Sequence, residues 1–248
     1  MAERTMVIGW DSSDFDLLAP WIEKGYMPNL KKLMDNSRWG KLSSVYPPQT
    51  ANAWSTIVTG KNSGKHGIFD FMQFKPNSYD FFPVNATNRA AKDVWEILSE
   101  NGRSVVVVGV PLTYPIRHVN GYMISGFMTP NESVDYSYPL SLKDEIQQKI
   151  PGYTVNPSQV YEGNTDDEDY VKLLFDVLNK HIEGVEYLAR NKEWDFFMAV
   201  FNETDWCLHR FWSTLDPNHP QYSLSRAKKY GTVIRDVHVR LDSALGVL

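Results

Sequence analysis

Residues 5–11 read TMVIGWD, a short apolar run that ends at an acidic side chain. An uninterrupted apolar run of this length is typical of a parallel strand that is buried on both faces of a sheet. Open sheets of such strands bind ligands just beyond the carboxyl ends of the strands, which is the position of Asp11. The segment therefore predicts the start of an α/β fold and the edge of the sheet where chemistry is expected.

Strands and helices continue to alternate after this first strand. We predict further strands at residues 39–45, 104–110, 122–126 and 195–201. Helices are predicted at residues 15–24, 29–36, 51–59, 92–100, 142–149, 166–191 and 223–248. Buried strands separated by helices predict a doubly wound, mostly parallel sheet with helices on both faces.

The segment from residue 111 to residue 163 differs in composition from the rest of the chain. It is rich in Pro, Tyr and Asn, and it holds one candidate strand and one candidate helix. We interpret it as a small inserted cap, with residues 1–110 and 164–248 forming the α/β core. The helix predicted at 223–248 has no C-terminal cap, and this favours a full protein that continues beyond it.

Length, composition and charge restrict the class of protein. The 248 residues are 42% hydrophobic and 22% charged, with a formal net charge of −5, which is typical of a soluble globular domain. No run of Lys or Arg forms a basic stripe, so a nucleic-acid duplex is not the expected partner. No membrane span or secretory signal is recognisable, and a cytoplasmic location is therefore expected.

Thr50 is a candidate for chemistry at the start of the helix predicted at 51–59. We expect Thr50 at the N-cap and Gly60 as the C-terminal glycine. The amides of Ala51 and Asn52 at a helix N-terminus suit a phosphate oxygen. A hydroxyl group there is placed for in-line attack on phosphorus, and a bound metal ion would lower its pKa. The alternative is that Thr50 is an ordinary helix cap.

Acidic and imidazole side chains follow two of the predicted strands. Asp205 and His209 stand four residues apart after the strand at 195–201, in the segment FNETDWCLHRFW. This spacing places both on one helical face or tight turn, where a carboxylate and an imidazole can share one Zn²⁺ ion. Asp11 follows the first strand in the same way. The alternatives are a surface Asp–His pair and, for Asp11, a helix cap.

The other histidines and the single cysteine have weaker patterns. His66 lies in a glycine-rich loop, where a structural turn is a better interpretation than a cleft-lining role. His181 and His238 lack partners at ligand spacing and are interpreted as surface or satisfied core residues. Cys207 excludes an intrachain disulfide because it is the only cysteine, and we expect it to be a small buried residue.

Together these motifs resemble the type I phosphodiesterase/nucleotide pyrophosphatase branch of the alkaline phosphatase superfamily. The segments that carry the resemblance are VIGWDSSD (7–14), MPNLKKLM (27–34), YPPQTANAWSTIVTGKNSGKHGIFDF (46–71), NGYMISGFMTPN (120–131) and FNETDWCLHRFW (201–212). They span nearly the whole chain, and their order and spacing are much more specific than any single motif.

The resemblance implies an alkaline-phosphatase-like sheet and a site with two divalent metal ions. Asp11 would bind one ion, Thr50 would be the nucleophile and bridge to that ion, and Asp205 with His209 would bind the second. The ions would be zinc, with manganese as the alternative, and they would clamp the attacking and leaving oxygens. The implied substrate is a small phosphodiester or a nucleotide-like molecule. These residues are then expected to meet at one edge of the sheet.

Two positions depart from the family pattern, and one motif of the family is absent from the sequence. Ala53 stands where animal members place a phosphate-binding Asn, which leaves the neighbouring Asn52 as the candidate substrate contact. Ser12 replaces the glycine that is usual after the first Asp. The chain contains no Asp-His dipeptide, although the family completes its metal site with a D-H-G motif and a further His, so we expect these ligands beyond Leu248.

Two alternatives to a phosphodiesterase or pyrophosphatase stay open. The same core would also serve a phosphomonoesterase or a phosphotransferase. The missing Asp-His pair motivates a second alternative from another class of protein. In this interpretation the chain is a non-catalytic or degenerate binder of phosphoryl ligands.

Overall fold

The chain forms two compact units in a computed structural model that describes residues 4–155, 157 and 165–248. The first unit comprises Met1–Gly9, Leu42–Asn156 and Tyr187–Val200. The second comprises Trp10–Lys41, Pro157–Glu186 and Phe201–Leu248.

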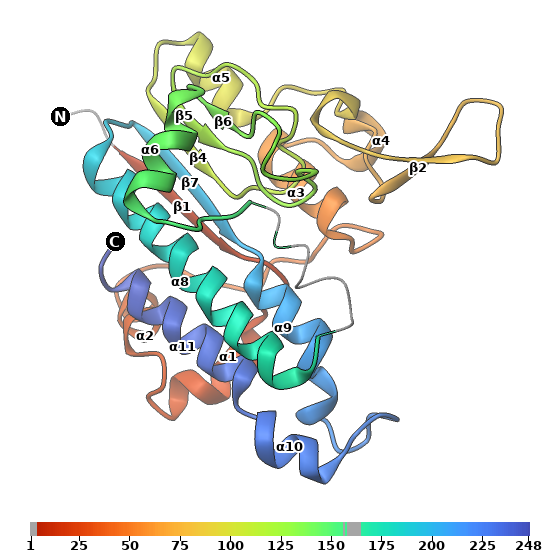
Figure 1. The fold of residues 1–248 in the computed structure, drawn as a ribbon, viewed down its shortest axis with the longest axis vertical. Coiled ribbons are helices and arrows are strands. Elements are labelled where there is room, and N and C mark those ends of the chain that lie inside the picture. The colour runs from red at the N-terminus through yellow and green to blue at the C-terminus, as the bar shows by residue number, and fades with distance from the viewer. Residues whose placement is uncertain (1–3, 156, 158–164) are drawn as a thin grey trace. The chain divides into compact units, whose positions relative to one another are not determined.

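A five-stranded sheet in the order β1–β7–β4–β5–β6 forms the centre of the first unit (Figure 1). The strands are β1 (Thr5–Trp10), β7 (Phe196–Phe201), β4 (Val105–Val108), β5 (Gly121–Ile124) and β6 (Ser137–Tyr138). Strand β4 runs parallel to both β5 and β7, whereas β6 runs antiparallel to β5. The predicted α/β class with a mostly parallel sheet is thus confirmed, and every residue of β4 is buried as its sequence predicts.

Helices α3 and α5 cover the sheet within the first unit. The helical elements of this unit are α3 (Thr50–Thr59), α4 (Ser63–His66), η1 (Ala86–Asn88), α5 (Val94–Glu100) and α6 (Ser141–Lys149). Trp54 of α3 and Trp95 of α5 join the core cluster formed with the valines of β4. A Cβ atom at Gly9 would lie 2.3 Å from the ring of Trp54, so the glycine of VIGWD allows α3 to lie close against β1.

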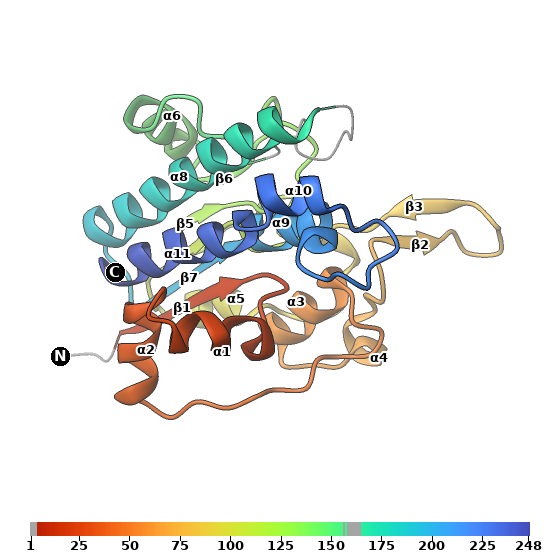
Figure 2. The same cartoon turned by 90° about the horizontal axis from the view of Figure 1, so that it is seen from below.

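A two-stranded antiparallel ribbon follows α4 in the first unit. It consists of β2 (Met72–Phe74) and β3 (Phe81–Pro83), and it extends away from the sheet (Figures 1 and 2). The rings of Phe74 and Phe81 face each other across the two strands with centroids 4.2 Å apart. This cross-strand aromatic pair stabilises a ribbon that is otherwise too small to bury a core.

The second unit is helical. Its elements are α1 (Phe15–Glu23), α2 (Pro28–Asp35), α8 (Asp167–Asn191, whose last turn belongs to the first unit), α9 (Glu203–Phe211), η2 (Trp212–Thr214), α10 (Leu224–Tyr230) and α11 (Val233–Leu245). Helices α9 and α11 lie side by side (Figures 1 and 2). The carboxylate of Asp242 on α11 accepts hydrogen bonds from the amides of Asn29 and Leu30, which caps the N-terminus of α2.

Two secondary-structure predictions are wrong. Residues 39–45 form no strand, because Leu42 is 92% exposed and the segment presents no apolar face to bury. The helix predicted over 223–248 is divided into α10 and α11 at Gly231 and Thr232. Both residues are poor helix formers, and their ψ angles of −5° and −11° open the helical turn.

The segment predicted as an inserted cap contributes two strands to the sheet. Both β5 and β6 lie within residues 111–163, while residues 156 and 158–163 lie outside the described part of the chain. The boundaries predicted for the cap and the core remain a prediction. None of the helices in the described ranges is long and apolar enough to cross a lipid bilayer.

Candidate active site

Thr50 is the first residue of α3 and is half-buried. The N-cap is Gln49, whose backbone is extended at φ −110° and ψ 140°, so the predicted cap is displaced by one residue. The carbonyl oxygen of Gln49 accepts the first helical hydrogen bond, from the amide of Ala53 at 2.8 Å. The amides of the first turn therefore have no acceptor within the helix and can bind an anionic oxygen. Gly60 ends α3 in the left-handed conformation, as predicted.

The side chain of Asn52 is directed into the first unit rather than toward solvent. Asn52 is fully buried, and its Nδ2 donates to the carbonyl oxygen of Pro47 at 3.0 Å. Its Oδ1 lies 3.5 Å from the hydroxyl group of Thr56, one turn further along α3. Both ends of the amide thus have partners within the protein. The role of Asn52 as a substrate contact remains a prediction.

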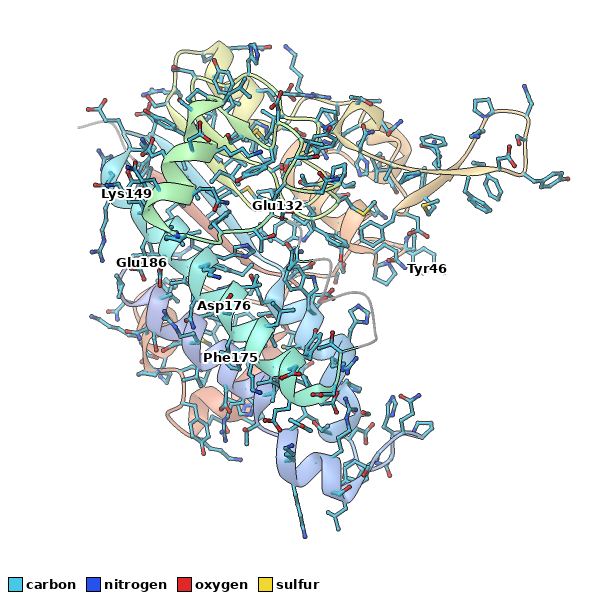
Figure 3. All side chains as sticks on the ribbon, in the orientation of Figure 1. Tyr46, Glu132, Lys149, Phe175, Asp176 and Glu186 are labelled. Atoms are coloured by element: carbon cyan, nitrogen blue, oxygen red, sulfur yellow. The ribbon has the colours of Figure 1, made fainter. Side chains whose placement is uncertain are left out.

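The segment before Thr50 is largely exposed and has no regular secondary structure. Tyr46, labelled in Figure 3, is 91% exposed. The amide of Gln49 donates to the carbonyl oxygen of Pro47 at 2.9 Å, which forms a tight turn just before the helix. Pro47 is therefore held from two sides, by Gln49 and by Asn52, and it defines how the chain enters α3.

Asp11 lies where β1 ends, and it makes hydrogen bonds to the last residue of β7 and to the segment that follows β7. Its amide donates to the carbonyl oxygen of Phe201 at 3.0 Å, and its carbonyl oxygen accepts from the hydroxyl group of Thr204 at 2.6 Å. Its carboxylate accepts from Nδ2 of Asn202 at 3.1 Å. The two strand ends that carry the predicted acidic residues are therefore neighbours, as the sheet order requires.

Ser12 connects the two predicted acidic ligands. Its amide donates to one carboxylate oxygen of Asp11 at 3.0 Å, and its hydroxyl group donates to Oδ1 of Asp205 at 2.6 Å. Its backbone is left-handed, with φ 58°, a conformation that glycine adopts without steric cost. This conformation explains why a glycine suits the position, and the serine adds a hydrogen bond that glycine cannot make.

Asp205 and His209 lie one turn apart on α9, so the helical spacing inferred from the sequence is confirmed. Nε2 of His209 is 3.4 Å from Oδ1 of Asp205. The His209 side chain is 81% exposed, while that of Asp205 is 19% exposed. The imidazole is therefore open to solvent while the carboxylate is mostly covered, and both groups are ligand types for zinc.

The structure links three of the predicted site residues in the second unit. Ser12 joins Asp11 to Asp205, and Asp205 in turn contacts His209, whereas Thr50 belongs to the first unit. Within the described ranges, no group of three or more His, Cys, Asp or Glu side chains is arranged to hold a metal ion. The Asp205–His209 pair fits two positions of a coordination sphere, and the predicted four-residue metal site remains a prediction.

Two histidines, the buried His238 and the half-buried His181, have tertiary partners that the sequence did not reveal. Nδ1 of His238 donates to the carbonyl oxygen of Ile234 at 2.7 Å, and its Nε2 accepts from the hydroxyl group of Ser13 at 2.9 Å. It thereby anchors the loop that carries Asp11, and burial lowers its pKa. His181 pairs with Glu203, which is fully buried at the start of α9.

Cys207 is fully buried on α9, and this position agrees with its interpretation as a small core residue. Its Sγ donates to the carbonyl oxygen of Thr204 at 3.1 Å, and burial raises the pKa of the thiol. A thiol in this state is a poor metal ligand, because coordination requires the thiolate.

The mostly parallel sheet flanked by helices is the α/β architecture of alkaline-phosphatase-like structures. Residues 5–248 match the type I phosphodiesterase / nucleotide pyrophosphatase family, and the chain belongs to that family. The match covers every segment on which the resemblance was based. No curated protein sequence matches the chain.

Solved structures share the fold at low sequence identity. Phosphonoacetate hydrolase from Sinorhizobium meliloti 1021, in complex with phosphonoacetate, is similar with a TM-score of 0.56 and 16% identity, over 98% of this chain and 54% of that one. Murine ectonucleotide pyrophosphatase/phosphodiesterase 5, as an inactive variant in complex with AMP, is similar with a TM-score of 0.55 and 16% identity, over 98% of this chain and 50% of that one. The chain thus spans about half the length of these proteins.

Proposed function

We propose that this protein hydrolyses phosphate esters in a metal-dependent reaction, with small phosphodiesters or pyrophosphates as substrates and Thr50 as the nucleophile. The observation that carries the proposal is the position of Thr50 at the first residue of α3, within a chain whose residues 5–248 match the family. The amides of the first helical turn suit two oxygens of the substrate phosphate.

The proposed reaction has two steps. In the first, Oγ1 of Thr50 forms a bond to phosphorus while the bond from phosphorus to the leaving oxygen breaks, and the hydroxyl proton is lost to solvent. In the second, water attacks the phosphothreonine ester, which restores the Thr50 hydroxyl group and releases the phosphate product. Covalent catalysis of this kind divides one difficult displacement into two easier ones.

Asp11, Asp205 and His209 would hold the divalent metal ions, with zinc favoured and manganese as the alternative. Bound divalent ions would lower the pKa of the Thr50 hydroxyl group and offset the negative charge of the phosphate. The hydrogen bonds from Ser12 and Asn202 orient two of the carboxylates, and His209 remains accessible to an ion from solvent. Further ligands are needed to complete two coordination spheres.

A nucleotide-like phosphodiester is the proposed substrate class. Family membership supports it, and one similar solved structure contains AMP. A phosphomonoesterase or phosphotransferase on the same core is the second candidate.

Turnover of two nitrophenyl esters tests the proposal. Bis(4-nitrophenyl) phosphate and 4-nitrophenyl phosphate are offered to the protein with added Zn²⁺ or Mn²⁺, and preference for the diester is expected. Thr50→Ala should lower kcat/KM by about 10³-fold or more, because it removes the nucleophile. Thr59→Ala, at the other end of α3, is the matched control and should retain turnover. Turnover of Thr50→Ala close to that of the unmodified protein would exclude this mechanism.

Metal content separates the enzyme from a degenerate binder. Elemental analysis after equilibration with zinc should give bound metal that Asp205→Asn and His209→Gln both reduce. Tight binding of a nucleotide without any bound metal and without turnover would favour the non-catalytic alternative.

A further inference from the structure

His66 is a fully buried histidine at the end of α4, and both of its ring nitrogens have partners. Nδ1 accepts a hydrogen bond from the amide of Ile68 at 3.1 Å. Nε2 lies 3.0 Å from the hydroxyl group of Thr56, on the second turn of α3. The side chain therefore joins the glycine-rich loop to the helix that begins with Thr50.

The protonation state of His66 follows from these two contacts. An amide can only donate, so Nδ1 must carry a lone pair, and the proton of the neutral ring must be on Nε2. His66 then donates to the Thr56 hydroxyl oxygen, which leaves the hydroxyl proton free to point elsewhere. Burial and the nearby Arg89 guanidinium lower the pKa of His66, which is consistent with a neutral ring.

The hydroxyl proton of Thr56 has an acceptor on the preceding turn of the same helix. Oδ1 of Asn52 lies 3.5 Å from Oγ1 of Thr56, a long hydrogen bond that nevertheless sets the direction of the amide. With Oδ1 facing Thr56, Nδ2 of Asn52 donates to the carbonyl oxygen of Pro47 at 3.0 Å. These contacts form a series of hydrogen bonds that runs from the amide of Ile68 through His66, Thr56 and Asn52 to the carbonyl oxygen of Pro47. Each donor in this series meets an acceptor.

The far end of this series is the turn that immediately precedes Thr50. Pro47 is held by the Asn52 amide and by the amide of Gln49, and Tyr46 beside it is largely solvent-exposed. The Asn52 side chain is therefore the contact by which the interior of the first unit restrains the start of α3. If its amide rotates, Pro47 faces an oxygen instead of a donor, and the turn is released.

We propose that His66 is a positioning residue for Thr50, acting through Thr56 and Asn52 to hold the start of α3 in one conformation. The inference rests on the proposed function, because it assigns to His66 the placement of the nucleophile. It also places Asn52 among the residues that orient the nucleophile rather than those that contact the substrate. Displacement of a nucleophile by about 1 Å can lower turnover by about 10²-fold.

Two substitutions of His66 separate positioning from a purely local turn. In His66→Gln the side-chain amide reaches the Nε2 position and still donates to Thr56. In His66→Asn the side-chain oxygen matches Nδ1 and still accepts from Ile68, but the donor to Thr56 is lost. Thr56→Val removes the hydroxyl group in the middle of the series with little change in shape, and Thr59→Val is the matched control on the same helix.

Hydrogen exchange, read by mass spectrometry on peptides that cover residues 46–54, is the first measurement. We expect exchange to be about 10-fold faster or more in His66→Asn and Thr56→Val, and unchanged in His66→Gln and Thr59→Val. In the nitrophenyl diester assay, the first two variants should lose about 10-fold to 100-fold in kcat with little change in KM. Thr56→Ser, which keeps the hydroxyl group, should show the exchange rate and the kcat of the unmodified protein.

Failure of the positioning role of His66 and failure of the proposed function give different results. Unchanged exchange over residues 46–54 in both His66→Asn and Thr56→Val would overturn the positioning role, whatever the activity. Faster exchange with no loss of kcat would also overturn it, because the start of α3 would then not limit turnover. Full turnover of Thr50→Ala would instead refute the proposed function, and the exchange results would not depend on that outcome.

Discussion

Ser12 shows how one residue can combine a conformational cost with a useful contact. Its backbone is left-handed at φ 58°, which costs a non-glycine residue roughly 1 kcal/mol. Its hydroxyl group donates to Asp205 at 2.6 Å, and its amide donates to Asp11 at 3.0 Å. The amide contact survives any substitution except proline, whereas the contact to Asp205 depends on the side-chain hydroxyl group.

Ser12→Gly and Ser12→Ala should separate these two effects. The glycine variant should gain about 0.5–1 kcal/mol in the free energy of unfolding, because the left-handed strain is relieved. The alanine variant retains the strain and should gain nothing. Both lose the hydroxyl contact to Asp205, so both should bind zinc about 10-fold more weakly. Denaturant unfolding and zinc titration measure the two quantities, and equal stability of the two variants would contradict the strain argument.

At the scale of elements, the placement of α3 depends on a glycine in β1. A Cβ atom at Gly9 would lie 2.3 Å from the Trp54 ring and 3.1 Å from the side chain of Val200. The Trp54 ring is part of the core cluster and cannot move without displacing its neighbours. The motif VIGWD thus contains, beside its acidic residue, the site on which the helix of Thr50 rests.

Gly9→Ala should lower the free energy of unfolding by about 2 kcal/mol, because it overpacks the contact between β1 and α3. Combining it with Trp54→Phe should recover part of this loss, because the smaller ring leaves room for the added methyl group. A double-mutant cycle from denaturant unfolding measures the coupling between the two positions. Strict additivity would show that the two residues do not compete for the same space.

A second element-scale contact joins α11 to α2. The Asp242 carboxylate is buried and accepts from the amides of Asn29 and Leu30 at 3.1 Å and 2.7 Å. Nδ2 of Asn29 also donates to it at 3.1 Å. Because Met27, at the N-cap position, offers no side-chain acceptor, α2 is capped instead by Asp242, which lies 213 positions beyond Asn29.

Asp242→Ala should therefore destabilise the protein by about 2 kcal/mol, near the upper end for loss of a helix cap. Asp236→Ala on the same helix is the control, since the Asp236 side chain is 42% exposed and pairs only with the neighbouring Arg235 in the described contacts. The control should change stability by less than about 0.5 kcal/mol. Comparable losses for both variants, measured by thermal and denaturant unfolding, would argue against tertiary capping.

At the scale of the whole molecule, buried neutral histidines predict how stability depends on pH. Burial lowers the pKa of His238, and burial with the nearby Arg89 lowers the pKa of His66, each from an ordinary value of 6.5. Below pH 6.5 the unfolded chain binds protons at these positions that the folded chain does not. Their contribution to stability is therefore complete above that pH and is lost progressively as the pH falls through the lowered values.

The free energy of unfolding should decrease from pH 7.5 to pH 5.5, and part of this decrease should be absent in His238→Gln. Glutamine cannot take up a proton, so the difference between the variant and the unmodified protein should shrink as the pH falls. Urea unfolding at pH 7.5, 6.5 and 5.5 gives the comparison. If the free energies of unfolding of the variant and the unmodified protein differ by the same amount at all three pH values, His238 is not held neutral by the fold.

Local patterns in the sequence determined much of the fold and part of the candidate site. Apolar runs identified β1 and β7 as strands, but only β7 is buried along its whole length, while β1 is half-buried and its predicted burial is wrong. The spacing of Asp205 and His209 predicted their common helical face. The order of several motifs identified the family, which the match over residues 5–248 confirms. The inferences about strands and helices needed only neighbouring residues, whose geometry is set by the backbone, whereas the family inference needed the order of motifs along the chain.

Only the tertiary structure decided the contacts that join distant parts of the chain. The links from His66 to Thr56, from His238 to Ser13 and from Asp242 to α2 follow no local period, so a single sequence contains no signal for them. The same reason explains the wrong strand at 39–45, because a strand exists only where another strand pairs with it. Periodicity specifies which face a residue occupies, and folding specifies what lies against that face.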